Sequence, residues 1–301
     1  MDRLEAMKIV LAVVEKGGFS AASRDLGIPL ATVSRKVHEL ERHLGTKLLV
    51  RTTRKVALTD AGALYVSSAR RILDEIDEIE RIAAGEFHIP RGELILSAPI
   101  LFGHLHVLPT VVEFLGSYPD INVRLLLSDR NVQLIDDHVD MAVRIGSLPD
   151  SSSIATRVGS LRTVVCASPK LLAAHGVPKT PEDLLALPCV NFEFLFPASL
   201  WSFRLNDTKG VVDVHTHPRL SVTTAESAVS AAIAGVGVTR VLHYQCASAL
   251  REDSLRIILA DFEGEPVPVH VLHAGRGALP SKMRVFLDFA VNRLRERLNS
   301  L

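Results

Sequence analysis

The sequence predicts an N-terminal winged helix-turn-helix unit (residues 1–59), a long linker helix (residues 60–88) and a C-terminal α/β region (residues 89–301). Three observations predict this organisation. The first sixty residues contain three short helical patterns and a basic hairpin, the next stretch carries one sustained helical repeat, and strand-like and helix-like segments alternate after it. The 301 residues suffice for two or three folding units with buried cores.

Spacing and glycines predict the first two helices. Apolar residues at three- and four-residue steps should form one buried helical face: Leu4, Met7, Leu11 and Val14. Gly17-Gly18 should end this helix. Ser20 is the predicted N-cap of the second helix, because its hydroxyl can accept a hydrogen bond from a free backbone N–H. Gly27 should end the second helix.

Residues 30–44 form the predicted third helix, which follows a break at Pro29. Its apolar stripe should pack on the first two helices and consists of Val33, Val37, Leu40 and Leu44. The opposite face carries Arg35, His38 and Arg42, with Thr32 and Ser34 on its flanks. Such a face offers donors and acceptors for base edges and phosphates; an ordinary solvated face is the alternative.

A basic hairpin should follow. No Asp or Glu occurs between Arg42 and Thr59, and Leu48–Val50 and Val56–Leu58 are apolar runs on either side of Arg51–Arg54. Residues 24–55 carry 8 Lys or Arg against 3 Asp or Glu, although the whole chain is balanced at 34 of each sign. A local basic patch favours duplex DNA as partner, with the third helix in the major groove and the wing on phosphates. The predicted DNA-binding residues are Ser20, Leu30, Thr32, Ser34, Arg35, His38, Arg51, Thr53 and Arg54.

Thr59 is the predicted N-cap of the linker helix, which should run to about residue 84. Its apolar residues recur at alternating four- and three-residue steps, as in a heptad seam. The seam residues assigned to dimerisation are Tyr65, Ala69, Ile72, Ile76 and Ile79. Pairing with the same helix of a second subunit would bury this seam, and packing on its own chain is the alternative. Gly85 and Pro90–Gly92 should form a hinge after it.

The remaining residues alternate strand and helix candidates, which predicts two subdomains with largely parallel sheets. The strand candidates are residues 93–98, 121–127, 141–145, 162–167, 189–194, 201–205, 211–215, 220–223, 236–241 and 267–273. The helix candidates are residues 101–115, 132–137, 169–175, 181–186, 225–234, 243–252 and 280–298. The aromatic residues at positions 192, 194, 196 and 201 should lie in the core, or else line an apolar part of a cleft.

Several classes of protein are excluded. Three unpatterned cysteines fit reduced thiols in a cytoplasmic protein, and we expect neither a signal peptide nor a membrane-spanning stretch. Two His-x-His pairs lack a third ligand for a metal ion. Cys166 lies in an apolar strand, so a buried inert thiol is expected rather than a nucleophile. Gly235-Val236-Gly237 follows a helix, which indicates a turn rather than a dinucleotide-binding motif. We therefore expect no bound metal, no cofactor and no enzymatic activity. The two rival classes are an enzyme with an N-terminal interaction module and a solute-binding protein.

Short motifs at fixed spacing cross the first sixty residues: Phe19-Ser20-Ala21-Ala22, Leu26-Gly27-Ile28, Val33-Ser34, Leu40-Glu41, Leu44-Gly45, Leu48-Leu49-Val50-Arg51-Thr52-Thr53-Arg54 and Leu58-Thr59-Asp60-Ala61-Gly62. Together they resemble the LysR-type transcriptional regulators, and Leu96-Ser97-Ala98-Pro99 and Asp140 to Gly146 continue the resemblance. It implies a periplasmic-binding-protein-like effector domain, with subdomain I at residues 92–161 and 268–301 and subdomain II at residues 162–267. Leu30 departs from the pattern, since the family often has a polar residue there.

Ligands of α/β sheets bind beyond the carboxyl ends of strands, where helix N-termini supply N–H donors. This rule and the resemblance select the effector-binding residues Ser97, Ala98, Pro99, Ile100, Ser128, Ile145, Gly146, Thr223 and Thr224. Helix capping is the alternative for the Ser and Thr residues. The resemblance implies a small, often anionic effector, a homodimer or homotetramer on promoter DNA, and RNA polymerase as a further candidate partner.

Overall fold

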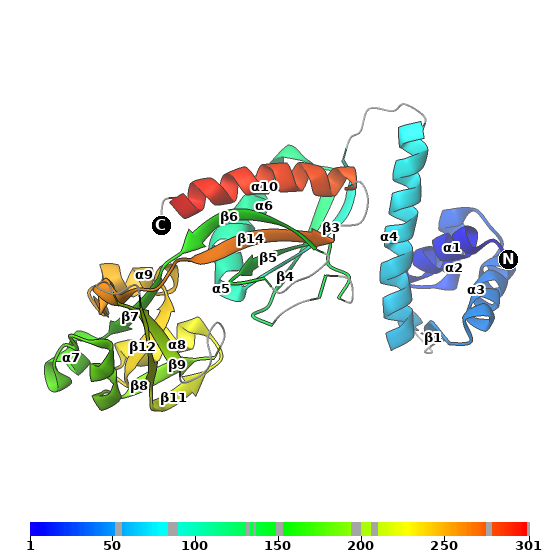
Figure 1. The fold of residues 1–301 in the computed structure, drawn as a ribbon. Helices are drawn as coiled ribbons and strands as arrows, with labels where there is room; N and C mark the ends of the chain where they lie inside the picture. The colour runs from blue at the N-terminus through cyan, green and yellow to red at the C-terminus, as the bar shows by residue number, and fades with distance from the viewer. Residues whose placement is uncertain are drawn as a thin grey trace. The chain divides into compact units, whose positions relative to one another are not determined.

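A computed structural model describes most of the chain: residues 1–51, 56–83, 90–130, 133–134, 137–148, 153–193, 200–205, 210–274 and 279–299. Several predicted features lie outside these ranges: the DNA contacts Thr53 and Arg54, the hinge residue Gly85, the aromatic residues Phe194 and Phe196, and half of the helix expected at residues 132–137. The chain forms two compact units, Met1–Gly92 and Glu93–Leu301, which we treat separately (Figure 1).

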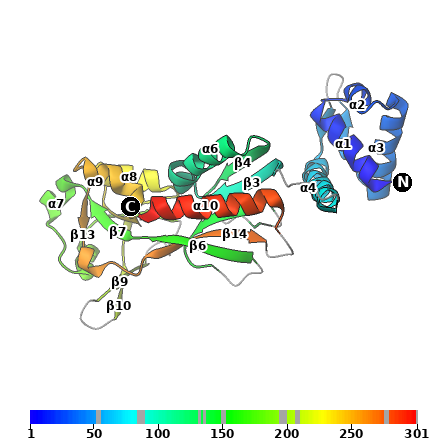
Figure 2. The ribbon, with the colours of Figure 1, turned by 90° about the horizontal axis from the view of Figure 1, so that it is seen from above.

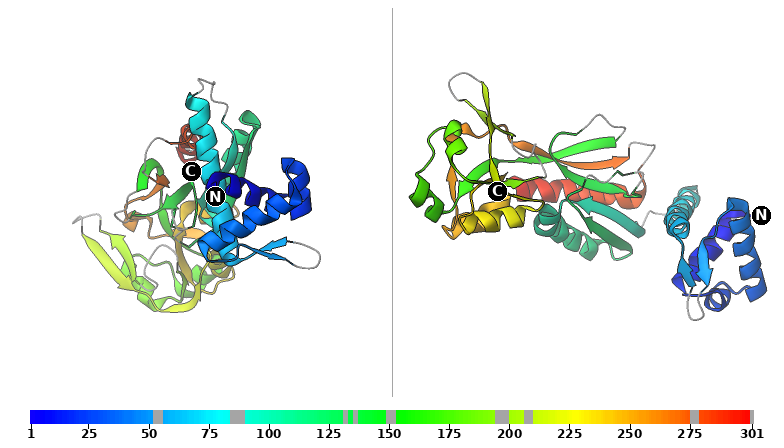
Figure 3. Two further views of the ribbon diagram at one scale, coloured as in Figure 1. Left: turned by 90° about the vertical axis from the view of Figure 1, so that its right-hand side faces the viewer. Right: turned by 90° about the horizontal axis from the view of Figure 1, so that it is seen from below.

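The first unit contains every element predicted for it. In chain order these are α1 (Arg3–Glu15), α2 (Phe19–Leu26), α3 (Leu30–Leu44), β1 (Leu49–Arg51), β2 (Val56–Leu58) and α4 (Asp60–Ala83). β1 and β2 pair antiparallel, with Val50 opposite Ala57, and the hairpin projects away from the helices (Figure 3). The winged helix-turn-helix architecture is therefore confirmed.

The buried face of α1 differs from the predicted one. Leu4 is 41% exposed, whereas the most deeply buried residues are Ala6, Ile9, Val10 and Val13. The sequence is apolar almost all round this helix from Ile9 onward, so its periodicity does not define one face. The chain enters the helix at Asp2, whose Oδ1 accepts from the N–H of Leu4 at 3.0 Å.

The ends of α2 and α3 show which local predictions hold. Gly18 occupies the N-cap position of α2, so Ser20 lies exposed in the first turn and its prediction as the N-cap is wrong. Gly27 ends α2 with φ +66°, the left-handed conformation typical of helix C-termini. α3 has the predicted bounds, but Leu44 is 40% exposed because it lies beyond the buried stripe, in the last turn.

The start of α4 is bound closely to the wing. The N–H of Gly62 donates to Thr59 Oγ1 at 2.9 Å, which confirms the predicted N-cap. The N–H of Thr59 in turn donates to the carbonyl of Leu48 at 3.0 Å. A Cβ atom at position 62 would lie 1.9 Å from that same carbonyl oxygen, so only glycine fits at this point of closest approach.

Two five-stranded sheets form the second unit. The first sheet has the order β4 (Ile121–Leu127), β3 (Gly92–Ala98), β5 (Met141–Ile145), β14 (Val267–Ala274) and β6 (Ser153–Leu161). The helices α6 (Leu108–Ser117) and α10 (Ser281–Asn299) pack on it, and α10 runs along the strands β6 and β14 (Figure 2). Phe102, Phe114 and Phe286 lie in the core that these elements share.

The second sheet has the order β11 (Pro218–Val222), β8 (Cys189–Phe192), β12 (Val238–Leu242), β7 (Thr163–Ala167) and β13 (Arg256–Ile258). One face packs on α8 (Ala225–Ile233) and α9 (His243–Arg251). The other face packs on α7 (Pro169–His175), a 3₁₀ helix (Pro181–Ala186) and the hairpin of β9 (Leu200–Arg204) and β10 (Val211–His215). Trp201 and Phe192 are buried, so these two aromatic residues belong to the core.

The chain passes between the two sheets twice, from Leu161 to Thr163 and from Ile258 to Val267. We call these segments the crossover connections. Arg162 joins them, because its Nη2 and Nε donate to Glu263 at 2.8 and 3.0 Å. β14 runs antiparallel to β5 and β6, and β12 runs antiparallel to β7, so the sheets are mixed and the prediction of largely parallel sheets is wrong.

The helix expected at residues 101–115 is a composite. A short helix α5 (Ile100–Phe102) leads into a π-helical turn (Gly103–Val107) and then into α6. Among the described residues, Ile100–Ser117 is the one helical run long and apolar enough to cross a membrane, which contradicts our expectation that no stretch reaches that length. Phe102, Val107 and Phe114 of this run are buried in the core of the first sheet, and a core helix passes the same test.

Candidate DNA-binding surface and effector site

The outward face of α3 carries the predicted reading residues. Arg35, His38 and Arg42 are exposed, as the helical spacing predicts. Thr32 and Ser34 are half-buried beside them, and the exposed Leu30 begins the helix. The structure thus brings these α3 residues to one surface, although the function of each stays a prediction.

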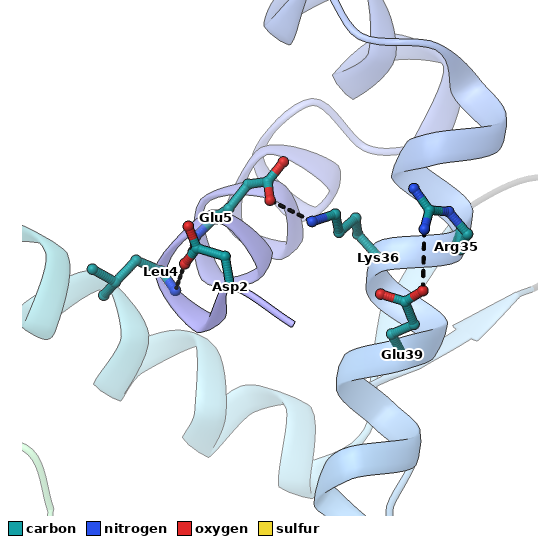
Figure 4. A network of polar contacts seen from close by, with 6 residues as sticks. All are labelled: Asp2, Leu4, Glu5, Arg35, Lys36 and Glu39. Carbon is teal, nitrogen blue, oxygen red and sulfur yellow. Dashed lines mark hydrogen bonds and ion pairs between the residues drawn. The ribbon is translucent and has the colours of Figure 1, made fainter.

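Two ion pairs position two of the three Lys and Arg side chains of α3 (Figure 4). The Lys36 ammonium pairs with Glu5 of α1, so this charge is held against the neighbouring helix. Arg35 Nη1 lies 3.3 Å from Glu39 Oε1, one helical turn away, and the Arg35 side chain is 63% exposed. An exposed pair of this kind is worth about 0.3–0.5 kcal/mol, so a DNA phosphate or base can replace Glu39.

Glu41 is a residue whose role the sequence analysis missed. It is 7% exposed, and its Oε1 accepts from the N–H groups of Leu48 and Leu49 at 3.0 and 3.2 Å. Its Oε2 accepts from Lys47 Nζ at 2.7 Å. Burial opposes ionisation, but the hydrogen bonds from Lys47 and the two amides lower the pKa of Glu41 from its usual value. The carboxylate thereby fixes the start of the wing to α3.

The wing is described at its base. Arg51 pairs with Val56 at the end of β1, and the side chain of Arg51 lies outside the described part. Thr53 and Arg54 lie there too, so the predicted phosphate contacts of the wing stay predictions. The described strands and the Glu41 carboxylate nonetheless hold the hairpin at a defined place beside α3.

The linker helix α4 has two apolar faces. One packs in the core of the winged unit through Val66, Ala69 and Leu73. Ala69 is 1% exposed, which is the own-chain packing that we considered as the alternative for the seam. Tyr65 also packs against this core. The structure therefore places two of the five seam residues on the inner side of the helix.

The outer face of α4 is exposed and apolar. Ile72 is 39% and Ile79 is 65% exposed, and Ile76 is half-buried. Leu64, which the sequence analysis did not select, is 59% exposed. Large apolar side chains repeated along one helix face are typical of an interface, so this face remains the candidate for dimerisation.

The loop after β3 contributes less surface than predicted. Ser97, Ala98 and Pro99 are buried, and only Ile100 is exposed, at 39%. Ser97 lines a small cavity of about 10 Å³, beside Thr110. A cavity of this size holds at most one water molecule, so Ser97 is enclosed in the core of the first sheet rather than presented to a ligand.

The hydroxyls selected on the other loops make local hydrogen bonds. Ser128 Oγ accepts from the N–H of Arg130 at 3.1 Å. Thr224 is the N-cap of α8, since its Oγ1 accepts from the N–H of Ser227 at 3.3 Å. Capping is therefore observed for Thr224, and a comparable turn for Ser128. Thr223 is exposed, while Ile145 and Gly146 are half-buried at the end of β5.

An unselected carboxylate occupies the expected anion position. Asp129 Oδ1 accepts from the N–H of Ile100 at 2.9 Å, at the start of the composite helix. Burial and the nearby Glu226 of α8 raise the pKa of Asp129, against the lowering effect of the Ile100 N–H. Asp129 follows a strand of the first sheet, and Glu226 lies in α8, which packs on the second sheet. The two acidic groups therefore interact across the subdomains.

An aromatic contact also crosses between the subdomains. Tyr244 of α9 lies edge-on to Phe102, with ring centroids 5.7 Å apart, and edge-on to His106 at 5.6 Å. Burial raises the pKa of Tyr244 and lowers that of His106. Tyr244 is therefore part of the core of subdomain I, although it follows a strand of subdomain II.

The described histidines and cysteines do not form a recognisable metal site or a reactive nucleophile. No group of three or more potential ligands that could hold a metal ion occurs among the described residues. His106 is buried while His104 is exposed, so this pair does not converge on one point. All three cysteines are buried free thiols, and burial raises the pKa of Cys189 to about 11.

The first unit is a helix-turn-helix with cations on its outward face, and the second is an α/β unit in which the chain passes twice between two sheets. This combination defines a ligand-responsive DNA-binding regulator. Residues 4–63 match the family described as "Bacterial regulatory helix-turn-helix protein, lysR family". Residues 88–295 match the "LysR substrate binding domain". The chain belongs to the LysR family of transcriptional regulators, and the resemblance noted in the sequence is confirmed.

Individual relatives agree with this assignment. An "HTH-type transcriptional regulator" of Xanthomonas campestris is 36% identical over 292 residues, covering 95% of this chain and 84% of the relative. The regulator CrgA of Neisseria meningitidis is 33% identical and covers 98% of both chains. Its solved structure aligns with a TM-score of 0.60 at 32% identity over 96% of this chain and 98% of CrgA. The full-length Vibrio cholerae virulence activator AphB gives 0.61 at 27% identity over 96% and 98%.

Proposed function

We propose that α3 reads the major groove of promoter DNA through Thr32, Ser34, Arg35 and His38, and that the wing anchors the phosphate backbone. The observation that supports this most directly is the exposed row of Arg35, His38 and Arg42 on the second helix of the helix-turn-helix. The relatives are named as transcriptional regulators, which fits a protein that acts by binding rather than by catalysis, in the cytoplasm.

Substitutions of Arg35 and Glu39 should change the affinity for DNA in opposite directions, which tests the proposed contact of Arg35 with DNA. Arg35→Ala should weaken specific binding by about 1–3 kcal/mol if its guanidinium contacts a base. Glu39→Ala should strengthen binding, because it removes the carboxylate that competes for Arg35 at 3.3 Å. Fluorescence anisotropy on DNA from upstream of the protein's own gene, with scrambled DNA as control, measures both across a salt series. Unchanged affinity in both variants would remove Arg35 from the reading surface.

We further propose that the outer face of α4 pairs with its copy in a homodimer, and that pairing of effector domains builds a tetramer. The exposed Ile72 and Ile79 support the first step. Two winged units would then be presented to two half-sites of the DNA. Contact with RNA polymerase would follow in complexes that activate transcription.

The effector site is proposed around the exposed Ile100 and Asp129. An anionic effector at this helix start would have to displace Asp129, which already accepts the Ile100 N–H. Asp129 and Glu226 together favour instead an effector that brings a cationic or hydrogen-bond-donating group between them. Asp129→Asn should abolish the change in DNA affinity that the effector causes, while basal DNA binding stays as in wild type.

A further inference from the structure

The first turn of α3 presents an apolar surface to solvent. Pro29, Leu30 and Ala31 are all exposed, and Leu30 is 45% exposed. Pro29 provides no side-chain hydrogen bond to cap the helix, and the first turn contains no acidic residue. The first polar side chain is that of Thr32, which is half-buried. The side chains of residues 29–31 therefore offer a partner neither a hydrogen-bond donor nor an acceptor.

Leu30 occupies the end of α3 that reaches base edges in a helix-turn-helix protein. The N-terminal residues of a recognition helix contact the bases, while other parts of the unit contact the backbone. Each Cα–Cβ bond of an α-helix tilts towards the N-terminus, so the side chain of the first residue projects beyond the end of the helix. Leu30 is the first residue of α3, and its side chain therefore precedes those of Thr32 and Arg35 on the way into the groove.

The turn before α3 holds this surface in place. The Ser23 hydroxyl donates to the carbonyl of Ile28 at 2.6 Å, and the N–H of Ile28 donates to the carbonyl of Ser23 at 3.2 Å. Pro29 has a φ of −58°, which its ring restricts. Val33, one turn into α3, is completely buried in the core of the winged unit. The apolar surface is thus pre-organised, and a contact with DNA need not order it first.

The major groove offers one apolar group to such a surface. Thymine presents its 5-methyl group there, whereas the other three bases present hydrogen-bond donors and acceptors. A donor or acceptor placed against Leu30 would lose its water and gain no partner, which disfavours those bases at this point. A single exposed leucine needs no explanation, but three consecutive exposed apolar residues at the reading end of a recognition helix do.

We propose that Leu30 selects thymine at one position of the DNA half-site, by packing its side chain against the 5-methyl group. This inference rests on the proposed function of α3, and it adds the base that the first turn recognises. The polar residue that the family often has at this position would instead read a base through hydrogen bonds. The half-site of this protein should therefore differ from those of such relatives at this base.

Replacement of single thymines by deoxyuridine tests the proposal, because uracil lacks only the 5-methyl group. The full-length protein first selects binding sites from a pool of random duplexes, and each thymine of one selected half-site is then replaced in turn. Wild-type protein should lose about fourfold in affinity at one of these thymines, as expected for one buried methyl group. Fluorescence anisotropy at a fixed salt concentration measures the affinities.

A substitution of Leu30 assigns the methyl contact to this side chain. Leu30→Ala should fold as wild type, since Leu30 is exposed, and should bind the thymine and deoxyuridine duplexes equally. Leu44→Ala is the matched control, because Leu44 is a 40% exposed leucine at the opposite end of the same 15-residue helix. It lies about 21 Å along the helix from Leu30 and should retain the fourfold preference for thymine.

Two outcomes would overturn the proposal. The first is that no single deoxyuridine weakens binding of the wild-type protein. The second is that Leu30→Ala discriminates between thymine and deoxyuridine as strongly as wild type does, which would assign the methyl contact to another side chain. A pool from which no sequence is enriched would overturn the proposed function, and this inference with it, so the two failures are distinguishable.

Discussion

The carboxylate of Glu41 is the most completely bonded buried charge described in the winged unit, and its substitution gives a sharp test. Glu41→Gln should lower the free energy of unfolding by about 1–3 kcal/mol at neutral pH, because a neutral amide cannot replace the charged acceptor of two amides and Lys47. Urea unfolding followed by circular dichroism measures this difference.

The same residue predicts a pH dependence. The pKa of Glu41 is lower in the folded protein than its usual value, so the carboxylate stabilises the fold above the unfolded-state pKa of about 4.3. This contribution is lost as the pH falls through the lowered pKa. The difference between wild type and Glu41→Gln should therefore shrink as the pH falls below the unfolded-state pKa. An equal difference at neutral and acid pH would contradict this account.

Individual residues were predictable where one periodic pattern decides their position. Arg35, His38 and Arg42 point outward because α3 is amphipathic along its whole length, and its spacing alone defines the face. Ser20 failed as an N-cap because several residues near a helix start can cap, and the path of the chain from Gly18 selects one. Asp129 was missed because its partner, the Ile100 N–H, is 29 residues away in the sequence.

At the scale of elements, the contact between the wing and α4 depends on a glycine. Gly62→Ala places a Cβ atom 1.9 Å from the Leu48 carbonyl oxygen, so β1 and α4 must separate. We expect a loss of about 1–3 kcal/mol in stability and weaker DNA binding, because the wing shifts with β1. Gly116→Ala in α6 is the matched control, since a Cβ there meets no atom within 4 Å and should stabilise by about 0.5–1 kcal/mol.

If the outer face of α4 is the dimer interface, a charge introduced on that face should weaken dimerisation. Ile79→Glu should weaken dimerisation, because an exposed apolar side chain of the proposed interface becomes charged. Glu80→Lys, on the exposed neighbouring position, should leave it unchanged. Analytical ultracentrifugation over a concentration series measures both. Ile76→Glu is a less specific probe, because Ile76 is half-buried and its substitution also perturbs the monomer. An unchanged sedimentation profile in Ile79→Glu would show that this face is not an interface.

Elements were predictable when they had a strong pattern of their own. β4, β5, β10 and α7 have the predicted bounds, since each is a short apolar or capped segment bounded by turn residues. β6 was missed because its polar and apolar residues show little alternation, and β13 because it has only three residues. Both become strands by pairing, β6 with β14 and β13 with β7. Such pairing is a tertiary effect that no local pattern reports.

At the scale of the whole chain, the Arg162–Glu263 pair links the two crossover connections. Glu263→Ala should change global stability by less than about 1 kcal/mol, because Arg162 is half-exposed and such pairs are weak. Amide hydrogen exchange at the crossover connections should nevertheless become faster, and the effector response should weaken. Asp253→Ala breaks a more exposed ion pair, the one with Arg256, and serves as the control. Unchanged exchange at residues 162–163 and 263–267 would show that the pair does not restrain them.

The N–H of Thr59 bonds to the Leu48 carbonyl and its Oγ1 accepts from the N–H of Gly62, so the wing and α4 are joined at one point, and this has a mechanical consequence. α4 has 24 residues, so it is about 36 Å long. A tilt of about 10° imposed at its distal end would displace its wing end by roughly 6 Å, which approaches two phosphate spacings along a DNA strand. A rotation too small to disturb any core could in this way move the wing from one phosphate to another.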